Sequence, residues 1–392
     1  MTILKWSSTL AFMWWFSLEN SITVTIGFIS PVRRHLTRPM SMVPLVSDGE
    51  GPRITAKSFD WSFIDRVYLI TCPNADPDKK RFEQAKKVLE AANLWHMVQI
   101  KSFDTDDEDR IRGCYTSHIS VLNDAMKDIE TSSSTKNTFM EMLRNVIPSS
   151  QFSSPELNYN ILVLEDNIAL TGNLDSTGLK EVRTYVDAAS SWDVIHLSYI
   201  PYVPSLVVSS TKSDRIVQLT TGIGSALGTT AYIINENAIR SLLRQDKEQS
   251  YYAAIPDVMA ELFPDTRYAA FPTPFLRAPK TKSLVNPQLD DLREILFQPV
   301  VTSAVQIILT KTGMSTNQLL PITIVSLLSI SSIAGKTAFD ALSSLIITGS
   351  YNGPILLAVL SFLITLISLG IIIQGILLAP QPPQTAEETK VK

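Results

Sequence analysis

The chain of 392 residues contains few cysteines and no glycosylation signal. Its two cysteines, Cys72 and Cys114, exclude a disulfide framework and a zinc site of the Cys-x-x-Cys type. The two cysteines could form one disulfide bridge, or they could equally be two buried thiols. The absence of any Asn-x-Ser/Thr sequence weakens an assignment to the secretory lumen.

Two common nucleotide-binding sequences and an excess of basic residues are also absent. The chain has neither Gly-x-Gly-x-x-Gly nor Gly-x-x-x-x-Gly-Lys-Ser/Thr, which excludes the dinucleotide fingerprint and the P-loop. Because 38 acidic residues outnumber 34 basic ones, the net charge of -4 gives no reason to expect a nucleic acid partner. The hydrophobic content of 45% is slightly high for a soluble protein, and part of it is concentrated near the C-terminus.

Residues 1–58 have the composition of a leader, targeting or linking segment. Trp6–Leu18 is an uncharged run of 13 residues, typical of a signal-peptide core, and a basic, proline-containing stretch follows over Pro31–Pro52. A plastid-type bipartite leader also fits this order. A third alternative is an imperfect membrane anchor over Trp6–Ile29, although Glu19 near its middle would be costly there.

Residues 59–285 have the pattern of an α/β domain with a central, mostly parallel sheet. Val67–Ile70 and Val98–Lys101 are predicted strands, and Asp76 followed by Pro77 predicts the start of the helix between them. Apolar residues recur at helical spacing in that helix: Phe82, Ala85, Val88, Leu89 and Ala92. The strand, helix, strand order predicts a βαβ unit.

The most informative stretch is Ile161–Asn167, in which four apolar residues run directly into Glu165, Asp166 and Asn167. The apolar part predicts a buried strand, and ligands of α/β sheets bind beyond the carboxyl ends of such strands. Two adjacent acids there need a cation, a positive side chain or a shared proton. A strand that simply ends in a polar turn is the plain alternative.

A second candidate site lies in Gly113–His118. The buried stripe that follows predicts a helix beginning close to Ser117 and His118, where free backbone N–H groups would favour an anion. The alternative is that His118 is a helix-start residue bonded to a carbonyl group. The stripe consists of Ile119, Leu122, Met126 and Ile129.

The rest of the domain contains weaker signals. Trp192–Leu197 and Thr230–Ile234 are predicted strands, and Glu236–Leu243 is a predicted helix. Residues 131–158 predict a surface insertion with one short amphipathic piece. Gly222–Gly228 suits either a tight turn or a close approach of the backbone to a ligand.

The order of these motifs resembles glycosyltransferase family 25, which includes lipooligosaccharide and collagen galactosyltransferases. Val67–Thr71 is similar to the family's first strand, with Arg81 at the position of a basic residue that commonly follows. Gly113–His118 is similar to the family's Gly-Cys-x-x-Ser-His motif, and Leu164–Asn167 to its Leu-Glu-Asp-Asp motif. The resemblance covers roughly residues 65–278 and also includes Asp193–Leu197, Gly228–Ile234 and Pro256-Asp257.

The resemblance implies a GT-A-like fold, a nucleotide-sugar donor and transfer of a hexose to a hydroxyl group of a glycan, lipid or protein, usually with manganese. It implies that Asp166 and Asn167 bind the metal and that Asp257 is a candidate catalytic base. It also implies a donor-binding set: Thr71, Arg81, Ser117, His118 and Glu165. Such a transfer needs positive charge on the leaving diphosphate and a base for the acceptor's proton.

One residue departs from the family's pattern: Asn167 stands where the last motif aspartate is expected. An amide oxygen can bind a hard cation but brings no charge, so the metal affinity should be lower. The alternative function is therefore a non-catalytic, glycosyltransferase-like membrane scaffold or binding protein.

The C-terminal part has a different composition. Residues 286–350 predict a linker with an apolar segment, Leu319–Ile333, for which a re-entrant, an interfacial and a second spanning helix are all open. Residues 354–380 predict a transmembrane helix, because Ile355–Ala379 is an uncharged run of 25 residues between two prolines. A buried helix of a soluble core is the alternative, and residues 381–392 form a polar tail.

These features together predict an anchored enzyme of the endomembrane system (ER or Golgi) or of a plastid. A third hypothesis makes the C-terminal helices the functional part, with the globular domain as a passenger.

Overall fold

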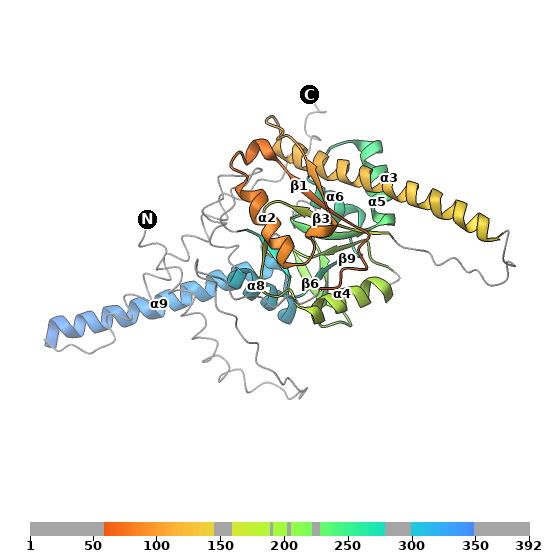
Figure 1. Cartoon of the computed structure of the whole chain (residues 1–392). Coiled ribbons are helices and arrows are strands. Elements are labelled where there is room, and N and C mark those ends of the chain that lie inside the picture. Colours follow the sequence, from red (N-terminus) through yellow and green to blue (C-terminus); the bar gives the residue numbers. More distant parts are fainter. Residues whose placement is uncertain are drawn as a thin grey trace, which may run out of the picture. The chain divides into compact units, whose positions relative to one another are not determined.

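The computed structural model describes residues 59–144, 159–188, 191–201, 205–221, 228–278 and 299–348 (Figure 1). It divides into two compact units. One spans Glu50–Asn317, and the described part of the other is the stretch from Gln318 to Thr348.

An eight-stranded sheet with the order β2-β1-β3-β8-β5-β9-β7-β6 forms the centre of the first unit. Six strands run in one direction and two, β7 and β8, run in the other. The α/β class with a mostly parallel sheet is therefore confirmed. The strands are β1 (Arg66–Thr71), β2 (Val98–Ser102), β3 (Asn160–Glu165), β5 (Val194–His196), β6 (Val207–Ser210), β7 (Ile216–Thr220), β8 (Ala231–Asn235) and β9 (Arg267–Ala270).

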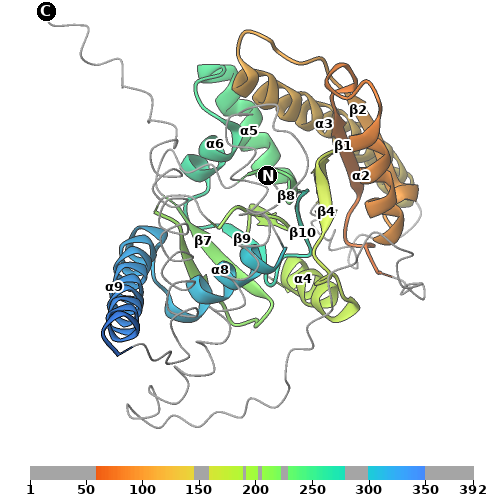
Figure 2. The same ribbon diagram turned by 90° about the vertical axis from the view of Figure 1, so that its left-hand side faces the viewer.

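Helices cover both faces of this sheet, as Figure 2 shows for α2 and α3 on the two sides of β1. Side chains alternate along each strand, so Val67 and Leu69 of β1 face one core while Tyr68 and Ile70 face the other. The first core is completed by α2 (Lys80–Ala91) and α4 (Ser176–Ala188). The second is completed by α3 (Arg110–Arg144), α5 (Glu236–Gln249) and α6 (Ile255–Leu262).

The predicted βαβ unit is present as β1, α2 and β2, and β1 pairs with β2 in parallel. The predicted start of its helix is wrong by three residues, because α2 begins at Lys80 after Lys79 in a left-handed conformation. Asp76 still acts as a cap, since its carboxylate accepts hydrogen bonds from the backbone N–H groups of Arg81 and Phe82.

The predicted position of Ser117 and His118 at a helix N-terminus is also wrong. Helix α3 begins at Arg110, which places both residues about two turns inside it. The first turn is capped by Asp109, whose carboxylate accepts from the backbone of Ile111 and Arg112. Helix α3 also continues through residues 131–144, the first part of the predicted surface insertion.

A smaller sheet pairs β4 (Ile168–Leu170) with β10 (Phe275–Arg277) in antiparallel fashion, directly after the acidic end of β3. Helix α8 (Pro299–Thr312) belongs to the same unit, because its buried Gln306 bonds to Thr273 at 3.2 Å. This unit therefore extends to Asn317, beyond residue 285, where the composition changes. Two short 3-10 helices, η1 (Pro73–Ala75) and η2 (Trp95–Met97), flank α2.

Helix α9 (Thr316–Thr348) contains the apolar segment Leu319–Ile333. No helix among the described residues combines the length and apolar character needed to cross a membrane. The predicted transmembrane helix at 354–380, the leader at 1–58 and most of the glycine-rich stretch, 222–227, lie outside the described residues.

Candidate functional site

The carboxyl ends of β1 and β3 lie side by side and bring the polar residues that follow them together. Ile70 is opposite Glu165 in the parallel pairing, and the backbone N–H of Asp166 donates to the carbonyl oxygen of Ile70 at 3.1 Å. Thr71, the last residue of β1, is buried, and its hydroxyl lies 3.5 Å from that of Ser102. The predicted edge site thus contains Thr71, Glu165 and Asp166.

Arg81 reaches this edge from the first turn of α2 and forms an ion pair with Asp166. Both side chains are largely buried, at 14% exposure for Arg81 and 4% for Asp166. Burial raises the pKa of Asp166, the positive charge of Arg81 opposes this rise, and the neighbouring Glu165 adds to it. The adjacent acids Glu165 and Asp166 need a positive charge nearby, and Arg81 supplies it.

Glu165 accepts two side-chain hydrogen bonds and lies close to a third polar group. Its Oε1 accepts a hydrogen bond from the hydroxyl of Thr229 at 2.6 Å, and its Oε2 accepts one from the side-chain amide of Asn167 at 3.1 Å. Nε2 of His118 lies 3.4 Å from Oε1. Burial works against the charged form, but these polar contacts outweigh it and lower the pKa of Glu165 to about 2. Glu165 is therefore a carboxylate at neutral pH.

Asn167 has one unused polar atom. Its amide nitrogen donates to Glu165 and its backbone carbonyl accepts from the N–H of Ala278 at 2.6 Å, whereas its Oδ1 is buried without a hydrogen-bond partner. An amide oxygen in this state suits a hard cation. Asp166 suits one less well, because Arg81 already neutralises it. The residues therefore fit manganese only in part.

His118 is fully buried and points to the same edge from α3. Its Nδ1 lies 2.9 Å from the hydroxyl of Tyr232, and the two rings stack with centroids 5.7 Å apart. Ser117 does not contribute in the same way, because its hydroxyl donates to the carbonyl of Gly113, one turn earlier in α3, at 2.7 Å.

Asp257 has a different set of neighbours. It lies in the first turn of α6, where its Oδ1 is buried and has no hydrogen-bond partner. Burial raises the pKa of Asp257, and the charge of the buried Arg267 on β9 opposes the rise. Among the described residues, no hydrogen bond or ion pair joins Asp257 to Glu165 or Asp166.

Three residues of this site were not predicted as functional: Cys114, Thr229 and Tyr232. Tyr232 lies on β8, directly opposite Val163 of β3. Only the antiparallel insertion of β8 next to β3 brings Tyr232 and Thr229 to Glu165, and no local sequence pattern specifies that pairing. Cys114 lies four residues before His118 on α3, so the two side chains share one face of the helix. This spacing could have identified Cys114 as part of the site once the start of the helix was known.

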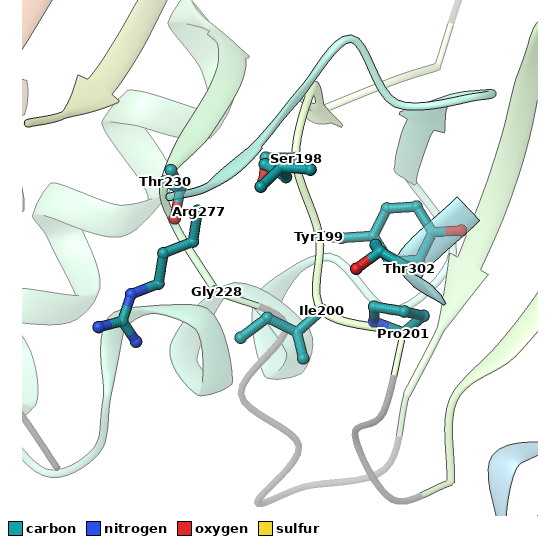
Figure 3. Close-up of a pocket in the computed structure, with 9 residues that line it drawn as sticks. Ser198, Tyr199, Ile200, Pro201, Gly228, Thr230, Arg277 and Thr302 are labelled. Carbon is teal, nitrogen blue, oxygen red and sulfur yellow. The ribbon is translucent and has the colours of Figure 1, made fainter. Parts of the chain in front are cut away.

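A small cavity of about 10 Å³ lies beside this edge and has room for about one water molecule (Figure 3). Thr230 connects it to the site, because its carbonyl oxygen accepts from the backbone N–H of Glu165 at 3.0 Å. The cavity is lined by Ser198, Tyr199, Ile200, Pro201, Gly228, Thr230, Leu276, Arg277 and Thr302.

The described residues thus define an α/β protein with a buried, charged site at the carboxyl edge of its sheet. The chain matches no protein-family model and has no significant match among curated proteins.

Proposed function

We propose that the protein is a membrane-anchored glycosyltransferase that moves a hexose from a nucleotide-sugar donor to a hydroxyl group of a glycan, lipid or protein. The observation that carries the proposal is the convergence of Arg81, His118, Glu165 and Asp166 at the carboxyl edge of β1 and β3. Ligands of open α/β sheets bind at such an edge.

The donor's diphosphate is assigned to the end of the site that contains Arg81. A guanidinium group has five N–H donors and forms bidentate contacts with phosphate. Nε of Arg81 is buried without a hydrogen-bond partner, so part of this donor capacity is unused. A diphosphate would share the guanidinium with Asp166, while Thr71, Ser117, His118 and Glu165 complete the donor-binding set.

A divalent cation, Mn²⁺ in the proposal, belongs between Asp166 and Asn167. It would neutralise charge on the leaving diphosphate. Support comes from the unpartnered Oδ1 of Asn167. The binding is expected to be weak, because Asn167 brings no charge and Arg81 competes for Asp166.

Asp257 is the proposed base for the acceptor's proton. An unpartnered carboxylate oxygen and a pKa raised by burial are properties that a general base needs. The membrane anchor is assigned to residues 354–380 on composition. The endomembrane or plastid location is proposed from the leader-like composition of residues 1–58 together with this anchor.

The test is release of nucleoside diphosphate by the purified full-length protein from a panel of nucleotide sugars, with Mn²⁺ and hydroxyl acceptors. We expect one donor to be consumed and a glycosylated product to form. Asp166→Asn should lower the rate at least about 100-fold, as removal of a key electrostatic group does. Asp124→Asn is the control, since Asp124 pairs with Lys101, and no hydrogen bond or ion pair of the described residues joins it to Glu165 or Asp166. Full activity in Asp166→Asn would refute the proposed site.

The second candidate function is a glycosyltransferase-like membrane scaffold or binding protein without catalysis. The ion pair between Arg81 and Asp166 favours it, because the strongest candidate metal ligand is already neutralised within the protein. This alternative predicts binding of a nucleotide or sugar with no turnover, and detection of a glycosylated product would exclude it.

A further inference from the structure

Cys114 has no role in the proposed transfer reaction, but it lies close to His118 and Glu165 of the proposed donor-binding set. One ligand-type atom from each, the Sγ of Cys114, a ring nitrogen of His118 and a carboxylate oxygen of Glu165, lies within 4.8 Å of the others. Cys114 and His118 are four residues apart on α3 and therefore lie on one face of the helix. Glu165 meets them from the end of β3.

We propose that Cys114, His118 and Glu165 form a zinc site. The ligands differ from Asp166 and Asn167, which are assigned to Mn²⁺, but Asn167 donates to Glu165, so the two positions are neighbours. The zinc site includes His118 and Glu165 of the proposed donor-binding set and in this respect rests on the proposed function. A thiolate, an imidazole and a carboxylate are ligands that zinc accepts together, whereas manganese, magnesium and calcium are suited by oxygen ligands and not by a thiolate.

The observation that points to a bound ion is the state of His118. Its side chain is 1% exposed, and its Nε2 is buried with no hydrogen-bond partner although it lies 3.4 Å from Oε1 of Glu165. An unsatisfied nitrogen at this depth is costly unless something binds it. A zinc ion between the two atoms would bind both.

The separation of these two atoms suits such an ion. Zinc bonds of about 2.0–2.2 Å to nitrogen and oxygen at a tetrahedral angle set the two ligand atoms about 3.4 Å apart. This equals the observed distance between Nε2 of His118 and Oε1 of Glu165, 3.4 Å. The Sγ of Cys114 lies within 4.8 Å of both atoms. Zinc–sulfur bonds of about 2.3 Å place sulfur about 3.5 Å from the other ligands, so Sγ would have to approach by at most about 1 Å.

Hydrogen-bond partners hold His118 and Glu165 in place, as is common for the ligands of metal sites. The hydroxyl of Tyr232 lies 2.9 Å from Nδ1 of His118, so Nδ1–H can donate to it and leave the lone pair of Nε2 for a metal. Thr229 and Asn167 hold the carboxylate of Glu165 from both sides. Three protein ligands leave the fourth zinc position open for water or another small ligand.

The test is independent of transfer activity. The metal-stripped full-length protein is titrated with Zn²⁺ in competition with a chromophoric chelator, and Co²⁺ is then used as a spectroscopic probe. We expect one equivalent of Zn²⁺ to bind, and the Co²⁺ form to show a thiolate-to-metal charge-transfer band. Cys114→Ser should lose the band, and Tyr232→Phe should weaken binding about 10- to 100-fold through the lost orientation of His118.

Cys72→Ser is the matched control, since Cys72 is the other of the two cysteines, and it should keep both the band and the affinity. A folded wild-type protein that binds no Zn²⁺, a Co²⁺ spectrum without the thiolate band, or equal losses in Cys72→Ser and Cys114→Ser would overturn the proposal. The wild-type Co²⁺ spectrum decides the matter even if Cys114→Ser does not fold. The metal titration and the Co²⁺ spectrum need no nucleotide, so failure of the zinc proposal is distinguished from failure of the proposed function, which is tested by nucleotide release.

Discussion

Arg81 and Asp166 form a buried ion pair that joins the first turn of α2 to the carboxyl end of β3. The two residues are 85 positions apart in the sequence, and the pair is possible because β1 and β3 are parallel neighbours. Asp76 fixes the start of α2 through the backbone of Arg81 itself. The central acid and its counter-charge are therefore positioned by the fold and not by local sequence.

Loss of Arg81 should destabilise the protein strongly. Arg81→Ala leaves Asp166, which is 4% exposed, without its counter-charge, and removing one partner of a buried pair costs about 3 to 5 kcal/mol. Denaturant unfolding of the full-length protein measures this loss. Lys80→Ala is the control, because Lys80 is 80% exposed and its surface pairing with Asp78 should contribute little. Equal effects of the two substitutions would contradict the assignment.

His196 should make the protein sensitive to acid. Burial, aided by the charge of Arg267, lowers the pKa of His196 from 6.5 to about 3. Between these values the unfolded chain binds a proton that the folded protein does not, so stability falls as the pH falls, by about 1.4 kcal/mol for each pH unit. His196→Phe removes this pH-dependent loss of stability, together with the two ring nitrogens that have no hydrogen-bond partner. Its unfolding free energy should depend less on pH from 6.5 to 3, and an unchanged slope would contradict this account.

Asp257 should act in transfer and not in donor binding. Asp257→Asn keeps the size of the side chain but removes the base, so transfer should fall by about 10²- to 10⁴-fold while nucleotide affinity stays the same. The two quantities are measured by product formation and by nucleotide titration. If the substitution lowers the melting temperature and leaves the transfer rate of the folded fraction unchanged, Asp257 serves only to balance Arg267.

The C-terminal apolar run should anchor the chain. Residues 355–379 contain no charged side chain, and a run of 25 such residues is long enough to span a bilayer. Truncation after Gly353 should move the protein from the membrane pellet to the supernatant on alkaline extraction. Truncation after Pro380, which removes only the polar tail, should leave it in the pellet. Retention of the shorter chain in membranes would place the anchor elsewhere.

The parts of the fold that depend on local pattern could be predicted from the sequence. The run Ile161–Leu164 forms a buried strand at the centre of the sheet, and the stripe that begins at Ile119 is buried on α3, as expected. Helix α4 was not predicted, although its buried Leu179, Val182 and Val186 have helical spacing that could have revealed it.

The start of α3 was missed although Asp109, which caps its first turn, is a local signal that could have marked it. Gly113 suggests a loop, but it lies inside the helix, where Asp106 packs so closely that an added Cβ would be 2.7 Å from its Cβ. Asp106 in turn pairs with Arg112. The partners of Glu165 could not be predicted, because they depend on a tertiary contact. Strand β8 reaches β3 through an antiparallel pairing, and Thr229 is 64 residues from Glu165 in the sequence.

The most direct test of the central claim is binding of nucleoside diphosphates to the full-length protein, measured by thermal shift with and without Mn²⁺, for the wild type and Asp166→Asn. We predict that one nucleotide stabilises the wild type, more so with Mn²⁺, and that Asp166→Asn loses the Mn²⁺-dependent part. Asp124→Asn should behave like the wild type. A folded wild-type protein that responds to no nucleotide, or an Asp166→Asn variant that responds as the wild type does, would contradict a donor site at the end of β3.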